Sequence, residues 1–258
     1  DLGDLFQSLE RSESIGETVL EVRDLCNYYV KNVSFELHRG EILGFSGLVG
    51  AGRTELMRSI YGADPTLSGT VLLGGKKIEN RSPAQAIANG IALCPEDRKE
   101  QGIIPTLSVG MNISISVLKR LRSACLLIDS KRETQLIEGG IRQFKIRTPN
   151  AQKKILELSG GNQQKAVVAR AHETNPDVII LDEPTKGIDV GAKSEFYKMI
   201  CEYARMGKGV ILISSELPEI IGLSDRIIVM REGRVTGEVS REDATEELIL
   251  QYAMLGGD

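Results

Sequence analysis

A glycine-rich segment, GLVGAGRTEL at residues 47–56, constrains the chain most strongly. It departs at one position from the phosphate-binding pattern G-x-x-x-x-G-K-[ST], because Arg53 stands where the pattern has lysine. Alternating apolar and polar residues before it predict a strand, and RTELMRSIYG after it has helical spacing and ends at Gly62. A strand, a glycine loop and a helix in this order can cradle an anion. Taken alone, the segment fits a working nucleotide site, a damaged one or an ordinary glycine-rich turn.

The rest of the chain predicts an α/β fold with a mainly parallel sheet. TVLEVRDL, VKNVSFELHRGEILGFSG and SGTVLLGGKKI have the pattern of strands. Beyond residue 176, the strands DVIILDEP and GVILISS alternate with the helices GAKSEFYKMICEYARMG and LPEIIGLS, and DRIIVMREGRVTGEV follows as a hairpin. Strands that alternate with helices are typical of a parallel sheet flanked by helices.

Two stretches are expected to lie outside this alternation. Residues 1–16 are polar and acidic without a sustained period, and they predict a linker or tail. From about residue 96 to 165 we expect an inserted helical subdomain, in which EDRKEQG is a charged loop and SVGMNISISVLKRL and SKRETQLIEGGIRQF are mostly helical. Before it, SPAQAIANG predicts a short helix with Ser82 as cap and Pro83 at its first position.

Composition places the chain among ordinary soluble globular proteins, with 41% hydrophobic and 26% charged residues. The net charge of −4 gives no general attraction for nucleic acid, although it allows a local basic patch. The longest apolar runs are far shorter than the roughly 20 residues of a membrane span. The cysteines, Cys26, Cys94, Cys125 and Cys201, are widely scattered, which predicts reduced thiols rather than a metal site.

Two further motifs decide how the glycine loop is interpreted. VIILDEP is a buried strand that ends in two carboxylates, Asp182 and Glu183. In phosphate-loop enzymes an Asp at such a strand end holds the Mg²⁺ shell, and an adjacent Glu can polarise the attacking water. LSGGNQQK, which begins at Leu158, opens a helix whose first-turn N–H groups favour an anion. Each motif alone could be a structural cap, but the three in this order predict a nucleotide site.

These motifs resemble those of an ATP-binding-cassette (ABC) ATPase domain over about residues 17–250. GLVGAGRT resembles its Walker A loop, LSGGN its signature, VIILDEP its Walker B motif and GIDV its D-loop. The resemblance implies a P-loop NTPase with a mainly parallel core sheet, a small antiparallel β subdomain and the inserted helical subdomain, in a domain that spans residues 17–258. PEDRK, DEPTKGIDVGAK and SSELPE are similar, more narrowly, to the second cassette of tandem sugar importers of the ribose, galactose and xylose type. The opening DLGDLF is similar to the linker after the first cassette, which implies the C-terminal half of a longer protein.

The resemblance assigns roles to individual residues of this sequence. Glu183 is implied as the general base, and ATP and Mg²⁺ as the ligands. Tyr28 or Tyr29 is expected to stack on adenine, with a core tyrosine as the alternative. The implied nucleotide-binding residues are Gly47, Val49, Gly50, Ala51, Gly52, Arg53, Thr54, Glu55 and Tyr28. The implied signature residues are Ser159, Gly160, Gly161, Asn162 and Gln163, the switch and coupling residues are Glu96, Asp189 and Ser215, and the Mg²⁺ ligands are Thr54, Asp182 and Glu96.

Four departures from the family pattern predict a degenerate site with slow or absent turnover. Arg53 replaces a lysine and stays cationic, but its planar fork is bulkier. Glu96 replaces a glutamine and would repel phosphate unless Mg²⁺ or Arg98 compensates. Ser215 replaces a histidine and is too short to carry the same contact, whereas Asn162 replaces a glutamine and keeps the amide.

The resemblance implies that the domain couples ATP binding and hydrolysis to sugar uptake. Its expected partners are an N-terminal cassette of the same polypeptide, transmembrane permease subunits and, indirectly, a sugar-binding protein, with no nucleic acid. In that arrangement the signature completes the partner cassette's site, and the domain is cytoplasmic and peripheral on the inner face of the membrane. The alternative is a nucleotide-gated regulatory or scaffold module without hydrolysis. A cassette of the DNA-repair or ribosome-acting kind fits poorly, because no coiled coil or basic extension is visible.

Overall fold

A six-stranded sheet forms the centre of the protein, in a computed structural model that describes residues 2–122 and 127–255. Its strands lie in the order β10-β9-β3-β8-β7-β6. Neighbouring strands from β9 to β6 pair in parallel, and β10 pairs antiparallel with β9, as the expected hairpin requires. The strands are β3 (Ile42–Gly47), β6 (Ile91–Cys94), β7 (Val178–Asp182), β8 (Gly209–Ile213), β9 (Arg226–Arg231) and β10 (Arg234–Ser240).

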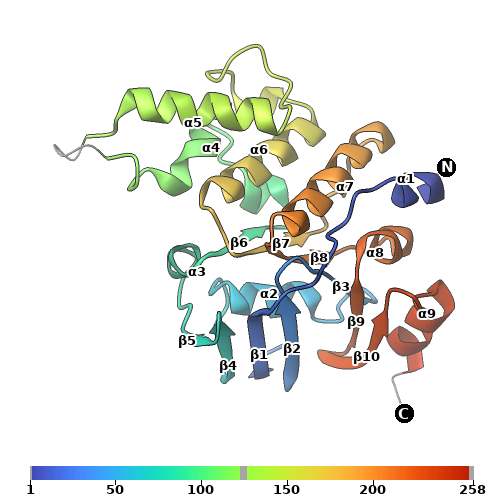
Figure 1. The fold of residues 1–258 in the computed structure, drawn as a ribbon. Helices are drawn as coiled ribbons and strands as arrows, with labels where there is room; N and C mark the ends of the chain where they lie inside the picture. The colour runs from blue at the N-terminus through green and yellow to red at the C-terminus, as the bar shows by residue number, and fades with distance from the viewer. Residues whose placement is uncertain (1, 123–126, 256–258) are drawn as a thin grey trace.

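A second, antiparallel sheet has four strands in the order β2-β1-β4-β5. Figure 1 shows it at the lower edge of the molecule, away from the helices α4, α5 and α6 at the top. Its strands are β1 (Thr18–Cys26), β2 (Val33–His38), β4 (Ser68–Leu73) and β5 (Lys76–Ile78). The mainly parallel sheet, the small antiparallel sheet and the helical layer are those that the sequence predicts.

Helices flank the central sheet and build the upper layer. They are α2 (Arg53–Ile60), α3 (Pro83–Asn89), α4 (Val109–Ser114), α5 (Ser130–Gln143), α6 (Gly160–Glu173), α7 (Val190–Arg205), α8 (Leu217–Leu223) and α9 (Glu246–Leu255). Ser82 caps α3 by accepting a hydrogen bond from the Gln85 N–H, and Pro83 opens the helix, as predicted. The subdomain boundary expected near residue 165 falls inside α6. Among the described residues, no helix is long and apolar enough to cross a membrane.

The core lies on both faces of the central sheet because its strands are buried on both sides. In β7 the side chains of Val178 and Ile180 join one apolar cluster, whereas those of Ile179 and Leu181 join another. This alternation follows from the two-residue period of a strand. A continuous apolar run such as VIIL is therefore the pattern expected for a central parallel strand. The described cysteines, Cys26, Cys94 and Cys201, are free thiols, and Cys125 lies outside the described residues.

Two segments differ from what the sequence predicts. Within EDRKEQG, which was expected to be a charged loop, Arg98–Gly102 forms a single π-helical turn. The Asp97 side chain accepts hydrogen bonds from the Lys99 and Glu100 N–H groups and so supports this turn. Residues 1–16 are expected to be a linker or tail, and within them Leu2–Gln7 form the helix α1, which the sequence period does not indicate.

Contacts with α7 and α8 explain why the N-terminal segment is ordered. The Phe6 ring lies 5.2 Å from the Tyr197 ring of α7. Arg11 Nη1 donates a hydrogen bond of 2.8 Å to the Leu223 carbonyl at the end of α8. The aromatic contact and the hydrogen bond with the domain thus stabilise the segment. Its sequence, which lacks a regular apolar period, would not form a stable helix alone.

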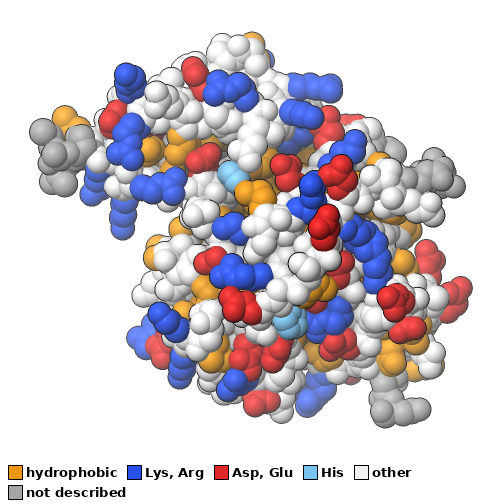
Figure 2. All heavy atoms as spheres, in the orientation of Figure 1, with side chains coloured by type: hydrophobic (Ala, Val, Ile, Leu, Met, Phe, Trp, Pro, Cys, Tyr) orange, Lys and Arg blue, Asp and Glu red, His pale blue; other side chains and the backbone are white. Residues whose placement is uncertain are grey.

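Charge is distributed unevenly over the surface. On the face in Figure 2, acidic and basic side chains intermingle over the lower lobe, whereas Lys and Arg are frequent over the upper lobe with α4, α5 and α6. Residues 107–157 contain ten Lys and Arg but four Asp and Glu, in a chain whose net charge is −4. The helical layer is therefore a basic part of an acidic chain.

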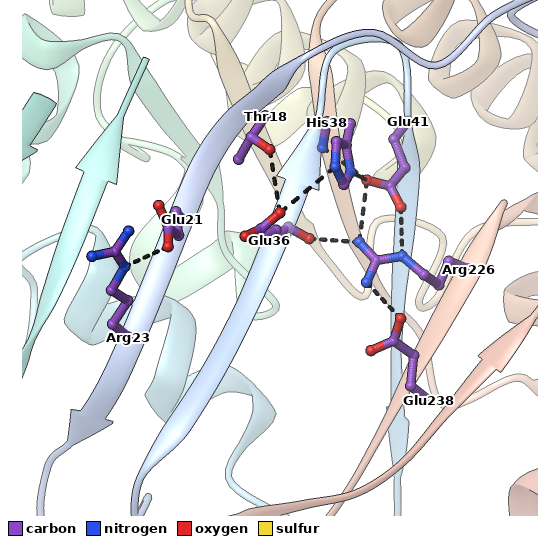
Figure 3. Close-up of polar contacts among 8 residues, drawn as sticks. All are labelled: Thr18, Glu21, Arg23, Glu36, His38, Glu41, Arg226 and Glu238. Atoms are coloured by element: carbon purple, nitrogen blue, oxygen red, sulfur yellow. Dashed lines mark hydrogen bonds and ion pairs between the residues drawn. The ribbon is translucent and has the colours of Figure 1, made fainter. Parts of the chain in front are cut away.

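An ion-pair cluster around the buried Glu41 joins the two sheets (Figure 3). Arg226 Nε donates to Glu41 Oε1 at 2.9 Å, and Arg226 Nη2 donates to the Glu36 carbonyl of β2 at 2.6 Å. Arg226 Nη1 donates to Glu238 of β10 at 2.8 Å. Burial lowers the pKa of Arg226, but the hydrogen bonds to Glu41 and Glu238 outweigh it and raise the pKa overall. Arg226 thus pairs with Glu41, which is only 1% exposed.

We expect Arg226→Met to destabilise the fold, because it leaves the buried Glu41 side chain with only its contacts to His38. Removing one member of a buried pair costs about 3–5 kcal/mol, and partial exposure of Arg226 reduces this to roughly 2–3 kcal/mol. Thermal unfolding should show a Tm about 5–10 °C lower. The double variant R226M/E41Q should recover most of the loss. A Tm within 1 °C of the parent for R226M would show that the cluster contributes no net stability.

Candidate nucleotide-binding site

The glycine loop connects the end of β3 to the start of α2. Gly50 and Gly52 have φ values of 80° and 96°, in the left-handed region that favours glycine. A Cβ at Gly52 would lie 2.9 Å from Val30 Cγ1, and one at Gly47 would collide with the Met230 carbonyl. Val49 at the loop tip is almost fully exposed. The loop is therefore fixed at its ends and open at its tip, where backbone N–H groups can meet phosphates.

Arg53, the first residue of α2, is buried and directed across the site. Its Nη1 donates a hydrogen bond of 3.2 Å to the Ser214 carbonyl at the end of β8. Burial raises the pKa values of Asp182 and Glu183, and the positive charge of Arg53 acts in the opposite direction. The guanidinium is thus a buried cation at the start of α2 whose charge reaches both carboxylates, and such a cation can bind a phosphate group.

Thr54 and Asp182 meet as the sequence predicts for a Mg²⁺ site. Thr54 Oγ1 donates to Asp182 Oδ2 at 2.8 Å, across 128 residues of sequence. Asp182 is 2% exposed, and its Oδ1 atom has no hydrogen-bond partner among the described residues. Burial raises the pKa of Asp182 to about 7, against the opposing effect of the Thr54 hydrogen bond. A buried, unpartnered carboxylate oxygen beside a hydroxyl fits a hard divalent cation.

Glu183 follows Asp182 in a left-handed backbone conformation, with φ of 48°. Its N–H donates to the Ile213 carbonyl at 2.9 Å, and the Ser215 hydroxyl donates to Glu183 Oε2 at 3.1 Å. Burial raises the pKa of Glu183, whereas hydrogen bonds from Ser215 lower it. A sparsely populated backbone conformation at a buried acid is typical of functional sites. The sequence located Ser215 at the site but did not show that Glu183 is its partner.

Glu96 has a cationic partner that the sequence did not indicate. From the sequence, Glu96 repels phosphate unless Mg²⁺ or Arg98 compensates; in the structure Lys186 Nζ donates to Glu96 Oε1 at 2.6 Å. The hydrogen bond to Glu96 raises the pKa of Lys186. Arg98 Nη1 instead donates to the Lys186 carbonyl at 3.1 Å, and a Cβ at Gly160 would lie 2.5 Å from Arg98 Nη2. Arg98 is therefore packed against the signature, and Lys186 is the residue that pairs with Glu96.

The signature segment forms the start of α6. Asn162 Nδ2 donates to Ser159 Oγ at 2.9 Å, and Asn162 Oδ1 accepts from the Arg147 N–H at 2.8 Å. Gln163 is buried and donates to the Leu158 carbonyl at 3.1 Å, so its amide faces its own domain. Ser159 is exposed. Among the residues that the structure describes, no hydrogen bond joins this segment to the glycine loop.

The D-loop lies beside the signature. A Cβ at Gly161 would lie 3.5 Å from Ile188 Cγ2 and 3.6 Å from Ala192 Cβ. Asp189 caps α7, because its Oδ1 accepts a hydrogen bond from the Ala192 N–H at 3.0 Å. The structure thus brings the signature and the D-loop together, and it places Thr54, Arg53 and the two carboxylates in a separate group.

Two tyrosines flank the glycine-loop helix. Tyr28 and Tyr29 are 75% and 63% exposed, so the core-tyrosine alternative is wrong. Both line a surface hollow that Glu55 and Arg58 of α2 also line. Either ring is accessible for stacking on adenine.

Sequence reasoning missed several residues of the site. Lys186 directly follows the DEPT segment, and its positive charge could have indicated a partner for Glu96. Ser214 accepts from Arg53 through its carbonyl, a contact that side-chain types do not reveal. Glu219 in SSELPE is buried among four donors, although a glutamate at that position of a helix usually faces solvent.

Comparison with known proteins identifies the class to which this site belongs. The family model described as "ABC transporter" matches residues 30–186. The chain therefore belongs to the ABC transporter family, with the fold of its ATPase domains.

Curated relatives are similar over nearly the whole chain. The arabinose import ATP-binding protein AraG 1 of Burkholderia thailandensis is 49% identical over 259 aligned residues, which cover 100% of this chain and 51% of that protein. The ribose import ATP-binding protein RbsA of Clostridium tetani is 48% identical over 93% of this chain and 48% of that protein. The chain thus spans about half the length of the curated relatives it matches.

Solved structures show the same fold. The ADP conformation of MJ1267, an ATP-binding cassette of an ABC transporter, has a TM-score of 0.74 at 22% identity, with 92% of this chain and 95% of that chain covered. The ATP-binding cassette MJ0796 bound to ADP and phosphate has a TM-score of 0.73 at 21% identity, with 86% and 98% covered. At these identities the likeness concerns the fold.

Proposed function

We propose that this chain is the ATP-binding domain of an ABC importer, and that it couples ATP binding and hydrolysis to sugar uptake. The observation that carries the proposal is the meeting of Thr54 and Asp182 beneath the glycine loop, with Asp182 Oδ1 unpartnered. Arg53 and Glu183 border the same place. The names of the arabinose and ribose import relatives support sugar as the transported class.

In this proposal the glycine loop binds the phosphates of ATP, and Thr54 and Asp182 hold Mg²⁺. When bound, Mg²⁺ neutralises charge that develops on the phosphates. Glu96 faces the same region, but its pairing with Lys186 favours a role in balancing charge over direct ligation. Adenine stacks on Tyr28 or Tyr29.

Glu183 acts as the general base of hydrolysis. Its carboxylate accepts a proton from the attacking water, and the Ser215 hydroxyl orients it through the hydrogen bond to Oε2. Ser215 supplies no positive charge, and Arg53 is engaged by the Ser214 carbonyl. We therefore propose a weakened site with slow turnover of its own.

The signature serves a second cassette. Ser159 is exposed beside the D-loop residue Asp189, and this edge suits the nucleotide of a partner that pairs head to tail. We propose an N-terminal cassette of the same polypeptide as that partner, transmembrane permease subunits and a sugar-binding protein as the other components, and a place on the cytoplasmic face of the membrane. The chain spans about half the length of these relatives, which leaves room for such a cassette.

The second candidate is a nucleotide-gated module without hydrolysis. The buried contact of Arg53 with the Ser214 carbonyl favours it, because a cation held by protein binds phosphate less readily. The presence of Glu183 with an orienting hydroxyl favours hydrolysis.

ATP turnover distinguishes the two candidates. We expect little turnover from this chain alone, and clear turnover when it is mixed with its partner cassette. A second mixture, in which the partner's own nucleotide site is disabled, isolates the site of this chain; we call it the partner-silenced pair. Absence of turnover in both mixtures would contradict the importer proposal and support the regulatory module.

A further inference from the structure

A buried carboxylate lies directly behind the candidate site. Glu219 of α8 is 2% exposed, yet both of its oxygens accept hydrogen bonds. Thr185 Oγ1 lies 2.8 Å from each oxygen, and Ser214 Oγ donates to Oε2 at 2.8 Å. Tyr197 OH and Lys193 Nζ donate to Oε1 at 2.6 and 3.1 Å. One side chain thus collects four donors from three segments of the chain.

Two of these donors stand next to reacting groups. Thr185 lies two residues after Glu183, on the loop that follows β7. Ser214 precedes Ser215, whose hydroxyl donates to Glu183 Oε2. The Ser214 carbonyl also accepts from Arg53 Nη1. The position of Ser214 therefore sets both the hydroxyl that orients the base and the cation of the glycine loop.

The other two donors belong to α7, which begins directly after Asp189. Burial raises the pKa of Glu219, but the hydrogen bonds from Tyr197, Thr185, Ser214 and Lys193 outweigh it and lower the pKa overall. Glu219 is thus an ionised and satisfied centre. A satisfied buried network fixes the segments it joins, whereas one with a missing member is costly.

We propose that Glu219 is a positioning residue for ATP hydrolysis at this site. It holds Ser214 so that Ser215 stays hydrogen-bonded to Glu183, and it ties this arrangement to the D-loop helix α7. Glu219 is buried, and it acts through Ser214 and Thr185. The inference rests on the proposed function, because it requires turnover at the site of this chain.

The test is Glu219→Gln in the partner-silenced pair, by single-turnover ATP hydrolysis. The amide keeps the size of the carboxylate but turns an NH₂ group toward donors. We expect the hydrolysis rate to fall about 10- to 100-fold, since the loss of one electrostatic contact that acts directly costs about 10²–10³. The affinity for ATP should stay within about threefold, because Glu219 contacts Ser214 through the hydroxyl, whereas Arg53 is held by the Ser214 backbone carbonyl.

Glu41→Gln is the matched control. Glu41 is equally buried, but it precedes β3 and so lies at the opposite end of that strand from the glycine loop. We expect E41Q to lower the Tm and to keep the hydrolysis rate. In the double variant E219Q/S215A the two losses should combine to less than their product, because both act on Glu183 through one path. If Glu219 contributed only to overall stability, the losses of hydrolysis rate in E219Q and S215A would multiply in the double variant.

The outcomes separate the inference from the proposed function. An unchanged hydrolysis rate in E219Q, with an active parent, overturns the inference and leaves the proposed function standing. An inactive parent in the partner-silenced pair overturns hydrolysis at this site and the inference with it. Should E219Q fail to fold, Ser214→Ala removes the link to Glu219, and we expect it to slow hydrolysis about tenfold. An unchanged rate in S214A overturns the inference equally.

Discussion

Glu183→Gln should reduce single-turnover ATP hydrolysis in the partner-silenced pair by about 10²–10⁴-fold. The amide is nearly isosteric with the carboxylate but cannot accept a proton from water. Because Ser215 donates to Glu183 Oε2, the substituted side chain can keep its place. ATP affinity, measured by calorimetric titration with Mg²⁺, should stay within about threefold of the parent.

The same variant separates two sources of turnover. In the pair with an active partner site, E183Q should leave most of the turnover intact, because this chain still supplies the partner with Ser159 and the signature. Glu232→Gln is a surface control of the same chemistry, since Glu232 is exposed, and it should change neither measurement. Undiminished hydrolysis by E183Q in the partner-silenced pair would exclude Glu183 as the base.

Asp182→Asn should stabilise the free protein at pH 8 while removing Mg²⁺ binding. Burial raises the pKa of Asp182 from 3.8 to about 7. Between about pH 4 and pH 7, Asp182 is therefore protonated in the folded state and ionised in the unfolded state. The stability that Asp182 contributes is complete below about pH 4 and is lost as the pH rises through 7. Substitution by a neutral amide should therefore raise the free energy of unfolding by roughly 2–4 kcal/mol at pH 8.

Denaturant unfolding of both proteins in the presence of a chelator measures this effect. The difference between D182N and the parent should be near zero around pH 4 and should grow up to about pH 8. Adding ATP and Mg²⁺ should stabilise the parent much more than D182N, because ligand stabilises only a state that binds it. A lower stability of D182N at pH 8 would show that the Thr54 hydrogen bond to Asp182 outweighs the cost of burying its charge.

Both predictions concern a site whose functional groups lower the stability of the free protein. A carboxylate with an unpartnered oxygen destabilises the free fold and becomes useful when a cation is bound. Active sites commonly carry such costs, and the left-handed backbone at Glu183 is a second example. In the network around Glu219, by contrast, both carboxylate oxygens accept hydrogen bonds. The network contacts the site through Thr185 and Ser214.

Local patterns in the sequence determined the elements that carry the site. The sequence predicted the glycine loop between β3 and α2 and the strand β7, because strand and helix periods depend on neighbouring residues. Parallel strands present their carboxyl ends at one edge, so Asp182 at the end of β7 was expected near the glycine loop after β3. The cap and first residue of α3, Ser82 and Pro83, were predictable for the same local reason.

The tertiary structure alone decided the partners of these groups. Lys186 rather than Arg98 pairs with Glu96 across 90 residues of sequence, and Arg53 meets a backbone carbonyl 161 residues away. The helix α1 is ordered by contacts such as that of Phe6 with Tyr197. Residue types along the chain specify which elements form, because those interactions are short in sequence. The pairing of charged side chains depends on how the packed elements place them in space. A buried charge such as Glu219 is stable only when all of its hydrogen-bond donors are in place.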